Sequence, residues 1–350
     1  MSFGERMIVR LRPRSATTAF PDAQESLALQ ASLLDGNRAI EAWKKLNVTK
    51  RDEESGIAWI APLLMANVAR LCPDDPWVRE NPHFLTLCEL KGRAVSESAQ
   101  RVVALLSAAG LRTLALKGLA LGATVYPSPG RRTVSDLDVL VPRSRVFDAF
   151  AALKASGYRA GPKEPTSADD LRAHHAHAFY PSHGRDQTLD LHWHVLASAR
   201  NDADDEPFWS EARPLKLGGN ETNALCIEDQ LLHVLVHGVR WTRMPHVRWV
   251  ADAAMILRSR EPFRVERFVE MTQRYDAVTP VEEGLRFLHG LLGEGESLLE
   301  RIRPLKRSRL SRRAFKARAT AYESRTIGDR VILRLETALW DRRARASRTN

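Results

Sequence analysis

The sequence predicts an α+β fold, in which a small mixed β-sheet is flanked by an N-terminal and a C-terminal helical region. Three observations support this prediction. Apolar residues recur at helical spacing through the first 110 residues and again from residue 228 onward. Between these regions, residues 111–141 alternate between extended and turn-forming segments. Residues 187–195 then alternate apolar and polar side chains, as a strand with one buried face does.

The N-terminal region shows the spacing of four helices and no group of residues with a chemistry of its own. Three of the four expected helices end at residues that helices rarely continue through. The expected ranges are 24–46, which Asp35-Gly36 breaks into two helices, 57–71, which ends before Pro73, and 84–109, which ends at Gly110. This region is therefore predicted to be a helical layer.

Residues 111–141 are the centre of the predicted fold. We expect a strand, a Lys117-Gly118 turn into a short helix, an arginine-bearing loop, and a second strand that presents Asp136 and Asp138. Successive side chains of a strand point to opposite faces, so these two aspartates share one face. Two such close carboxylates stay ionised only with positive charge between them, and oxygen ligands favour Mg²⁺ or Mn²⁺.

A third carboxylate is predicted on a later strand. After a helix that runs to Lys154, residues 176–182 and 187–195 have the pattern of two strands in a hairpin. In the second of these, one face carries Thr188, Asp190, His192 and His194. We expect an antiparallel neighbour to bring Asp190 together with the earlier pair of aspartates.

The C-terminal half is expected to be mostly helical after a polar loop that begins at residue 200. The expected helices span 228–239, 247–257, 263–275, 281–292 and 296–303. Four parts follow from these patterns: an N-terminal helical region at 1–95, the core with its three aspartates at 96–200, a C-terminal helical region at 201–303, and a basic helical tail at 304–350.

Composition excludes several classes of protein. With 44% hydrophobic and 27% charged residues, the chain is neither disordered nor fibrous. Its cysteines, Cys72, Cys88 and Cys226, lie far apart without a CxxC pair, which predicts buried thiols. No apolar run approaches the roughly 20 residues that a bilayer requires, and the N-terminus lacks a signal-peptide core. We therefore expect a cytoplasmic protein without a membrane partner.

The positive charge of the chain is concentrated at its C-terminus. Residues 301–350 contain 16 Lys or Arg against 4 Asp or Glu, a local charge of +12, so the other 300 residues sum to −2 (10 − 12). Two interpretations of this basic tail remain open. It is either a solvated arginine-rich helix or a surface for nucleic acid or an acidic partner. Apolar residues within it, among them Trp340, are typical of a helix that packs on something.

The turn before the first aspartates is suited to phosphate. A strand that ends in a glycine turn and enters a helix points backbone N–H groups at whatever lies above it. Lys117 would add a point charge there, and Arg131 or Arg132 a fork of donors. Further along the chain, Trp241 is a candidate for stacking on a base, although a tryptophan among helices is more often core.

The order of these elements resembles the DNA polymerase beta-like nucleotidyltransferase superfamily, with its hDhDh strand and later hDh motif. More narrowly, the chain resembles a family of bacterial uncharacterised nucleotidyltransferases. The motifs that carry this resemblance are LKG, Tyr126-Pro127, Arg132, SDLDVLV and LDLHW. The resemblance covers roughly residues 85–260. The chain departs from the superfamily at the turn, where Lys117-Gly118 replaces Gly-Ser or Gly-Gly and makes Lys117 the candidate for the serine's phosphate contact.

The resemblance implies a reaction and a role for each residue. Asp136 and Asp138 would hold two Mg²⁺ ions, or Mn²⁺, that bind the triphosphate of an NTP. Asp190 would complete one metal site and help to deprotonate an acceptor hydroxyl, after which pyrophosphate leaves and the nucleoside monophosphate is transferred. The residues expected to bind the nucleotide are Lys117, Gly118, Arg131, Arg132, His192 and Trp241.

Two other functions remain open on the sequence. The first is a catalytically silent nucleotide- or RNA-binding protein of the same fold that uses the basic tail. The second is a zinc hydrolase, because histidines are gathered at 174, 175, 177, 183, 192 and 194. His233 and His237 are four residues apart on an expected helix without an HExxH motif, so a packing role is expected for them. The acceptor, whether sugar, antibiotic, tRNA end or protein hydroxyl, has no signature here.

Overall fold

The computed structural model describes residues 19–46, 56–182, 186–240, 247–320 and 325–346. Contacts group the chain into two compact units, each assembled from segments that are distant in sequence. Unit 1 is Met1–Leu87, Val234–Arg260 and Val269–Leu333, and unit 2 is Cys88–His233, Glu261–Phe268 and Arg334–Asn350. The division into four parts by sequence stays a prediction.

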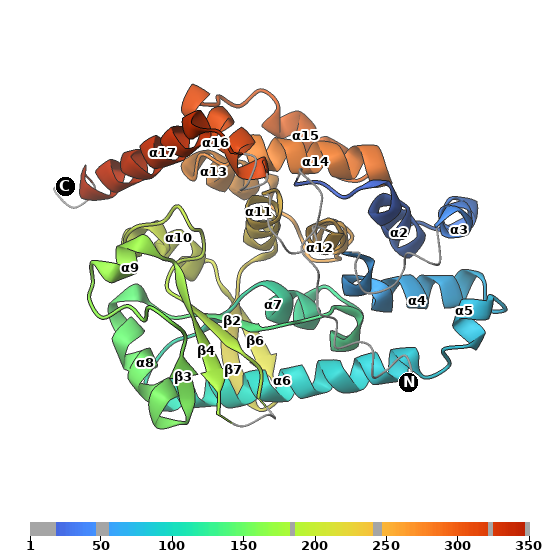
Figure 1. Ribbon diagram of the computed structural model, residues 1–350, viewed down its shortest axis with the longest axis horizontal. Coiled ribbons are helices and arrows are strands. Elements are labelled where there is room, and N and C mark those ends of the chain that lie inside the picture. The colour runs from blue at the N-terminus through green and yellow to red at the C-terminus, as the bar shows by residue number, and fades with distance from the viewer. Residues whose placement is uncertain (1–18, 47–55, 183–185, 241–246, 321–324, 347–350) are drawn as a thin grey trace. The chain divides into compact units, whose positions relative to one another are not determined.

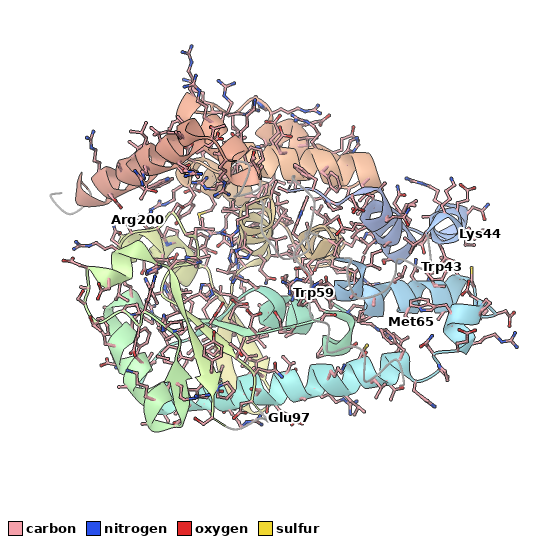
Figure 2. All side chains as sticks on the ribbon, viewed as in Figure 1. Trp43, Lys44, Trp59, Met65, Glu97 and Arg200 are labelled. Carbon is pink, nitrogen blue, oxygen red and sulfur yellow. The ribbon has the colours of Figure 1, made fainter. Side chains whose placement is uncertain are left out.

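Unit 1 begins with the helical layer that the sequence predicts. Its first helices are α2 (Ala23–Leu33), α3 (Gly36–Lys45), the 3₁₀ turn η2 (Gly56–Trp59), α4 (Ala61–Leu71) and α5 (Pro76–Arg79). The expected break falls at Gly36, whose φ of +57° lies in the left-handed region that suits glycine. Trp43 on α3 is buried and its indole N–H donates to Asp75, whereas Lys44 beside it points outward (Figure 2).

The C-terminal helices are also close to their expected positions. They are α11 (Ile227–Gly238), α12 (Val247–Leu257), α13 (Val265–Arg274), α14 (Val278–Leu292), α15 (Glu296–Ile302), α16 (Arg309–Ala319) and α17 (Ile327–Ala346). Gly293 terminates α14 with a φ of +79°. No helix among the described residues combines the length and the apolar character needed to cross a membrane.

Unit 2 contains a seven-stranded mixed sheet, which confirms the predicted α+β class (Figure 1). The strand order is β3-β4-β5-β2-β1-β7-β6. The strands are β1 (Leu114–Ala115), β2 (Leu137–Leu140), β3 (Tyr158–Ala160), β4 (Ala176–Pro181), β5 (Leu189–His192), β6 (Arg213–Leu217) and β7 (Asn220–Ala224). The central strands β5, β2 and β1 are neighbours in the sheet, and their pairing sets the positions of Asp138 on β2 and Asp190 on β5.

One face of this sheet is covered by helices. These helices are α6 (Phe84–Ala108) and α8 (Val146–Ala155), which lie beside the strands in Figure 1. The core between them contains Val103 and Leu106 of α6, Phe150 of α8, and the alternate strand residues Leu137, Val139, Leu189 and Leu191. Because strand side chains alternate, Asp138, Asp190 and His192 point to the opposite face.

The pairing of β2 with β5 corrects one expectation. The two strands are neighbours, but they run parallel rather than antiparallel, with Asp138 opposite Asp190 and Leu140 opposite His192. The chain between them makes a crossover through α8 and β3 before the antiparallel hairpin of β4 and β5, which the sequence does predict. Part of the expected hairpin turn, residues 183–185, lies outside the described residues.

A second hairpin is absent from the sequence predictions. β6 and β7 pair in antiparallel around Gly218-Gly219, where Gly218 has a φ of +59°. β7 then extends the sheet in parallel beside β1. The strands went unrecognised because β7 is rich in Asn, Glu and Thr, which mask its period-two pattern, although Leu215 and Leu217 and the two-glycine turn are present as signals.

Candidate active site

Asp138, Asp190 and His192 form a compact group on the face of the two central parallel strands that lies opposite the core under α6 and α8, and Asp138 and His192 are buried there. One ligand atom from each side chain lies within 4.8 Å of the others, a spacing that would allow a shared metal ion. The register explains the proximity, since Asp138 and Asp190 are direct neighbours across β2 and β5. Nε2 of His192 is 2.9 Å from Oδ1 of Asp138. Two carboxylates and one imidazole therefore converge on one point.

Lys117 reaches this group from the end of β1. The backbone N–H of Leu116 donates to the carbonyl oxygen of Asp138 at 2.9 Å, which places the next residue beside the aspartate. The Lys117 ammonium donates to Oδ1 of Asp138 at 2.5 Å and lies 3.4 Å from Nε2 of His192. Lys117 is also the first residue of α7 (Lys117–Thr124), so the predicted strand, turn and short helix are all present.

The two aspartates of this group are perturbed in opposite directions. Burial alone would raise the pKa of Asp138, but the Lys117 ammonium and the hydrogen bonds from His192 and Lys117 hold that pKa well below its ordinary value. Burial raises the pKa of Asp190, and the neighbouring Asp138 carboxylate raises it further. Asp190 therefore carries the uncompensated negative charge of the site, which a cation would relieve.

Removing the charge of Asp190 should stabilise the metal-free protein. A carboxylate whose pKa is raised by folding destabilises the folded state above that pKa, and this penalty disappears once it is protonated in both states. We expect Asp190→Asn to raise the melting temperature by a few degrees at pH 7 in EDTA. The gain should shrink towards about pH 3.5, below the ordinary aspartate pKa of about 3.9. Thermal unfolding followed by circular dichroism measures both, and a lower melting temperature at pH 7 would disprove the repulsion.

Asp136 is placed differently from its expected position. β2 begins at Leu137, so Asp136 lies in the bend before the strand, half-buried, and accepts a hydrogen bond from the Ser135 hydroxyl at 2.6 Å. It is outside the compact group, although its charge still contributes to raising the pKa of Asp190. The strand therefore does not itself present the two aspartates side by side, as the sequence pattern had indicated.

The two candidate arginines have different surroundings. Arg132 is buried, and its guanidinium donates to the carbonyl oxygen of Thr133. It packs over Gly118, where an added Cβ would lie 2.1 Å from a guanidinium nitrogen. Arg131 instead faces α6, with Nε 3.7 Å from a carboxylate oxygen of Glu89. Gly118 thus supports the arginine next to the Lys117 turn, and Arg131 belongs to the contact with α6.

The predicted histidine face also separates into two parts. β5 ends at His192, and His194 beyond it is fully buried with Nδ1 bonded to Asp205. Asp205 in turn accepts the backbone N–H of Val195 at 2.8 Å, and burial raises the pKa of its carboxyl. Asp205 had no signal in the sequence, because it lies in a polar loop whose several aspartates look equally exposed.

The structure gives little support to a site made of histidines. Within the described part of the chain, the group able to hold a metal contains a single histidine, His192, beside two aspartates. His183 lies in the undescribed segment 183–185. Trp241, the candidate for base stacking, likewise lies outside the described residues, in 241–246. Those two residues remain expectations from sequence.

A mixed sheet whose central parallel strands bring two aspartates together, beside a strand–turn–helix that carries a lysine, is a nucleotidyltransferase-like core. The chain belongs to the family described as uncharacterised nucleotidyltransferases, whose profile matches residues 59–293, more than half of its length. It is therefore a nucleotidyltransferase by family, as the sequence resemblance predicts. No curated protein matches the chain significantly.

Two solved structures of the antibiotic-resistance factor ANT(2'')-Ia are similar to part of the chain. Its solution structure is 16% identical with a TM-score of 0.37, and the match covers 53% of this chain and 94% of that one. Its crystal structure in complex with adenylyl-2''-tobramycin is 13% identical with a TM-score of 0.37, covering 52% and 97%. Similarity at this level adds nothing to the assignment, which rests on the family match.

Proposed function

We propose that the protein transfers a nucleoside monophosphate from an NTP to a hydroxyl acceptor and releases pyrophosphate, with Mg²⁺ or Mn²⁺ as the cofactor. The observation that carries the proposal is the pairing of Asp138 with Asp190 across two parallel strands, with ligand atoms within 4.8 Å. The raised pKa of Asp190 supports it, because a carboxylate held next to another one favours a cation between them.

The donor set fits a hard divalent cation. Asp138 and Asp190 would supply oxygen ligands, and His192 would supply a nitrogen ligand. Mn²⁺ accepts both kinds of ligand, whereas Mg²⁺ would be held mainly by the carboxylate oxygens. Asp136 would join from the adjoining bend, where its charge already acts on Asp190. When bound, the metal would neutralise the triphosphate and align it for in-line attack. Asp190 would accept the proton of the acceptor hydroxyl, for which a raised pKa is suited.

The nucleotide would lie above the Lys117-Gly118 turn. Lys117, which donates to Asp138, and the Arg132 guanidinium, which packs against Gly118, would contact phosphate oxygens. Arg131 and Trp241 are retained as nucleotide-binding candidates from sequence. Because the described contacts of Arg131 include Glu89, we expect its effect on nucleotide affinity to be smaller than that of Arg132.

The proposal is tested by incubating the purified protein with each α-labelled NTP, Mg²⁺ and a fractionated cell extract. Label should enter an acceptor with one or more of the NTPs, and EDTA should abolish the transfer. If no NTP labels any fraction, or if EDTA leaves labelling unchanged, the proposed reaction is wrong. The fraction that accepts label identifies the acceptor as small molecule, RNA or protein.

The basic tail supports a second, smaller proposal. Arg330, Arg334 and Arg342 on α17 are exposed, and they would suit a nucleic-acid or acidic partner. Deleting the whole tail is a poor test, because Ala314 and Ala317 on α16 are fully buried and their loss would expose core. Replacing these three arginines by glutamine keeps the helix and removes only charge.

For a nucleic-acid partner, we expect the triple glutamine variant to bind RNA more weakly and with a less steep salt dependence. Each lost phosphate contact lowers the slope of log K against log salt by about 0.7 for a single strand. Fluorescence anisotropy at several salt concentrations measures the slope. An unchanged slope would rule out nucleic acid as the partner of these arginines. RNA binding by the parent protein without any nucleotide turnover would favour the catalytically silent binding protein.

We also propose that the protein is cytoplasmic and has no membrane partner.

A further inference from the structure

The Lys117 ammonium lies where a cation would bind. It donates to Oδ1 of Asp138 at 2.5 Å and is 3.4 Å from Nε2 of His192, so it contacts two of the three side chains that could ligate a metal. The lysine side chain is 20% exposed and covers an aspartate side chain that is only 5% exposed. The buried Asp138 carboxylate is therefore already paired with a positive charge, the ammonium of Lys117.

The backbone holds this lysine in place. Lys117 has a φ of +46°, in the left-handed region that glycine adopts freely and other residues rarely do. Such conformations persist where the surrounding structure determines them. Here Leu116 is fixed to Asp138 by a backbone hydrogen bond, and Gly118 is packed under the Arg132 guanidinium. These two contacts thus hold the backbone of Lys117 in its strained conformation beside Asp138.

We propose that Lys117 is a positioning residue that occupies Asp138 until a triphosphate draws it away, so that it opposes metal binding alone and favours nucleotide binding. This inference rests on the proposed function. An ammonium and a divalent cation repel each other and compete for the same Oδ1, which disfavours the metal in the absence of nucleotide. A triphosphate offers the ammonium other oxygens, so metal and nucleotide bind with positive coupling, which is reciprocal by linkage.

The first test measures Mn²⁺ alone, without nucleotide, by the loss of the free-ion signal in electron paramagnetic resonance. Full-length protein is compared with Lys117→Met, Lys117→Gln and the charge-preserving Lys117→Arg. We expect the two neutral variants to bind Mn²⁺ roughly tenfold more tightly. A charge at this distance shifts the pKa of a carboxyl by about 1–3 units, and the tenfold figure corresponds to the lower end of that range. The Lys117→Arg variant, which keeps the positive charge, should bind Mn²⁺ as weakly as the parent protein. Adding Asp138→Asn to Lys117→Met should abolish the gain.

The second test measures the nucleotide. Calorimetric titration with each of the four α,β-methylene nucleoside triphosphates in Mg²⁺ should show weaker binding to Lys117→Met than to the parent protein. Opposite changes in the two affinities are the signature of the proposal, since a purely structural lysine would weaken both. Equal or weaker Mn²⁺ binding by both neutral variants would overturn it. That failure is distinct from failure of the proposed function, which would be the absence of nucleotide labelling by the parent protein.

Discussion

The Asp138→Asn variant is expected to lose nucleotidyl transfer by roughly 1,000-fold or more. Asp138 is the buried carboxylate on which Lys117, His192 and the proposed cation converge. An amide keeps the shape but removes the charge, and a metal contributes several kcal/mol of transition-state stabilisation at about 1.4 kcal/mol per tenfold in rate. The measurement is the initial rate of transfer from α-labelled NTP at saturating Mg²⁺.

A matched control separates chemistry from folding in this experiment. Asp202→Asn makes the same change at an exposed position of unit 2, in the 3₁₀ turn η5 (Asp202–Asp204), and should keep the rate of the parent protein. Circular dichroism should show both variants folded. A loss of less than tenfold for folded Asp138→Asn would mean that this aspartate does not hold the reacting groups.

The Gly92→Ala variant is expected to destabilise the protein by about 2 kcal/mol, within the range for overpacking a tight contact. Alanine inside a helix is normally the better residue by about 1 kcal/mol. At Gly92 on α6, however, an added Cβ would lie 2.5 Å from the backbone nitrogen of Gly130, and backbone cannot move aside as a flexible side chain can. This close approach fastens the loop that carries Arg131 and Arg132 to α6.

Gly122→Ala is the matched control for that prediction. Gly122 lies on α7 and faces the same loop, but an added Cβ would be 3.9 Å from Cα of Pro129, an ordinary contact. We expect this variant to be unchanged or stabilised by about 0.5–1 kcal/mol. Urea unfolding of the two variants and the parent gives the comparison. A Gly92→Ala protein as stable as the parent would show that the loop does not pack tightly on α6.

Local signals in the sequence predicted most of the elements. The break between α2 and α3 falls at Asp35-Gly36 as expected, and α6 ends just before Gly110, because left-handed backbone after a helix end is specific to a few residue types. The acid strands were equally recognisable, since aspartate among Val and Leu at period two is rare enough to indicate a function. These signals depend on neighbouring residues alone, and they predict the candidate site on the segments that form β1, α7, β2 and β5.

Pairing between distant segments was beyond the sequence. The alternation in β5 shows which face is buried but not the direction of its neighbour, so the parallel register of Asp138 with Asp190 was unforeseen. The start of β2 at Leu137 placed Asp136 in a bend, and this depends on where the hydrogen bonds to β5 begin, with Leu137 donating to the Thr188 carbonyl. The parallel register also sets Leu140 opposite His192, and Nε2 of His192 lies 2.9 Å from Oδ1 of Asp138.

Nucleotidyl transfer is tested most directly by following two labels in parallel. The acceptor fraction found with α-labelled NTP is incubated with the purified protein, Mg²⁺ and the same NTP labelled at either the α- or the γ-phosphate. The account predicts that α label is retained in the acceptor while γ label leaves as pyrophosphate, and that Asp138→Asn prevents both. Transfer of γ label to the acceptor, or pyrophosphate release that survives Asp138→Asn, would contradict it.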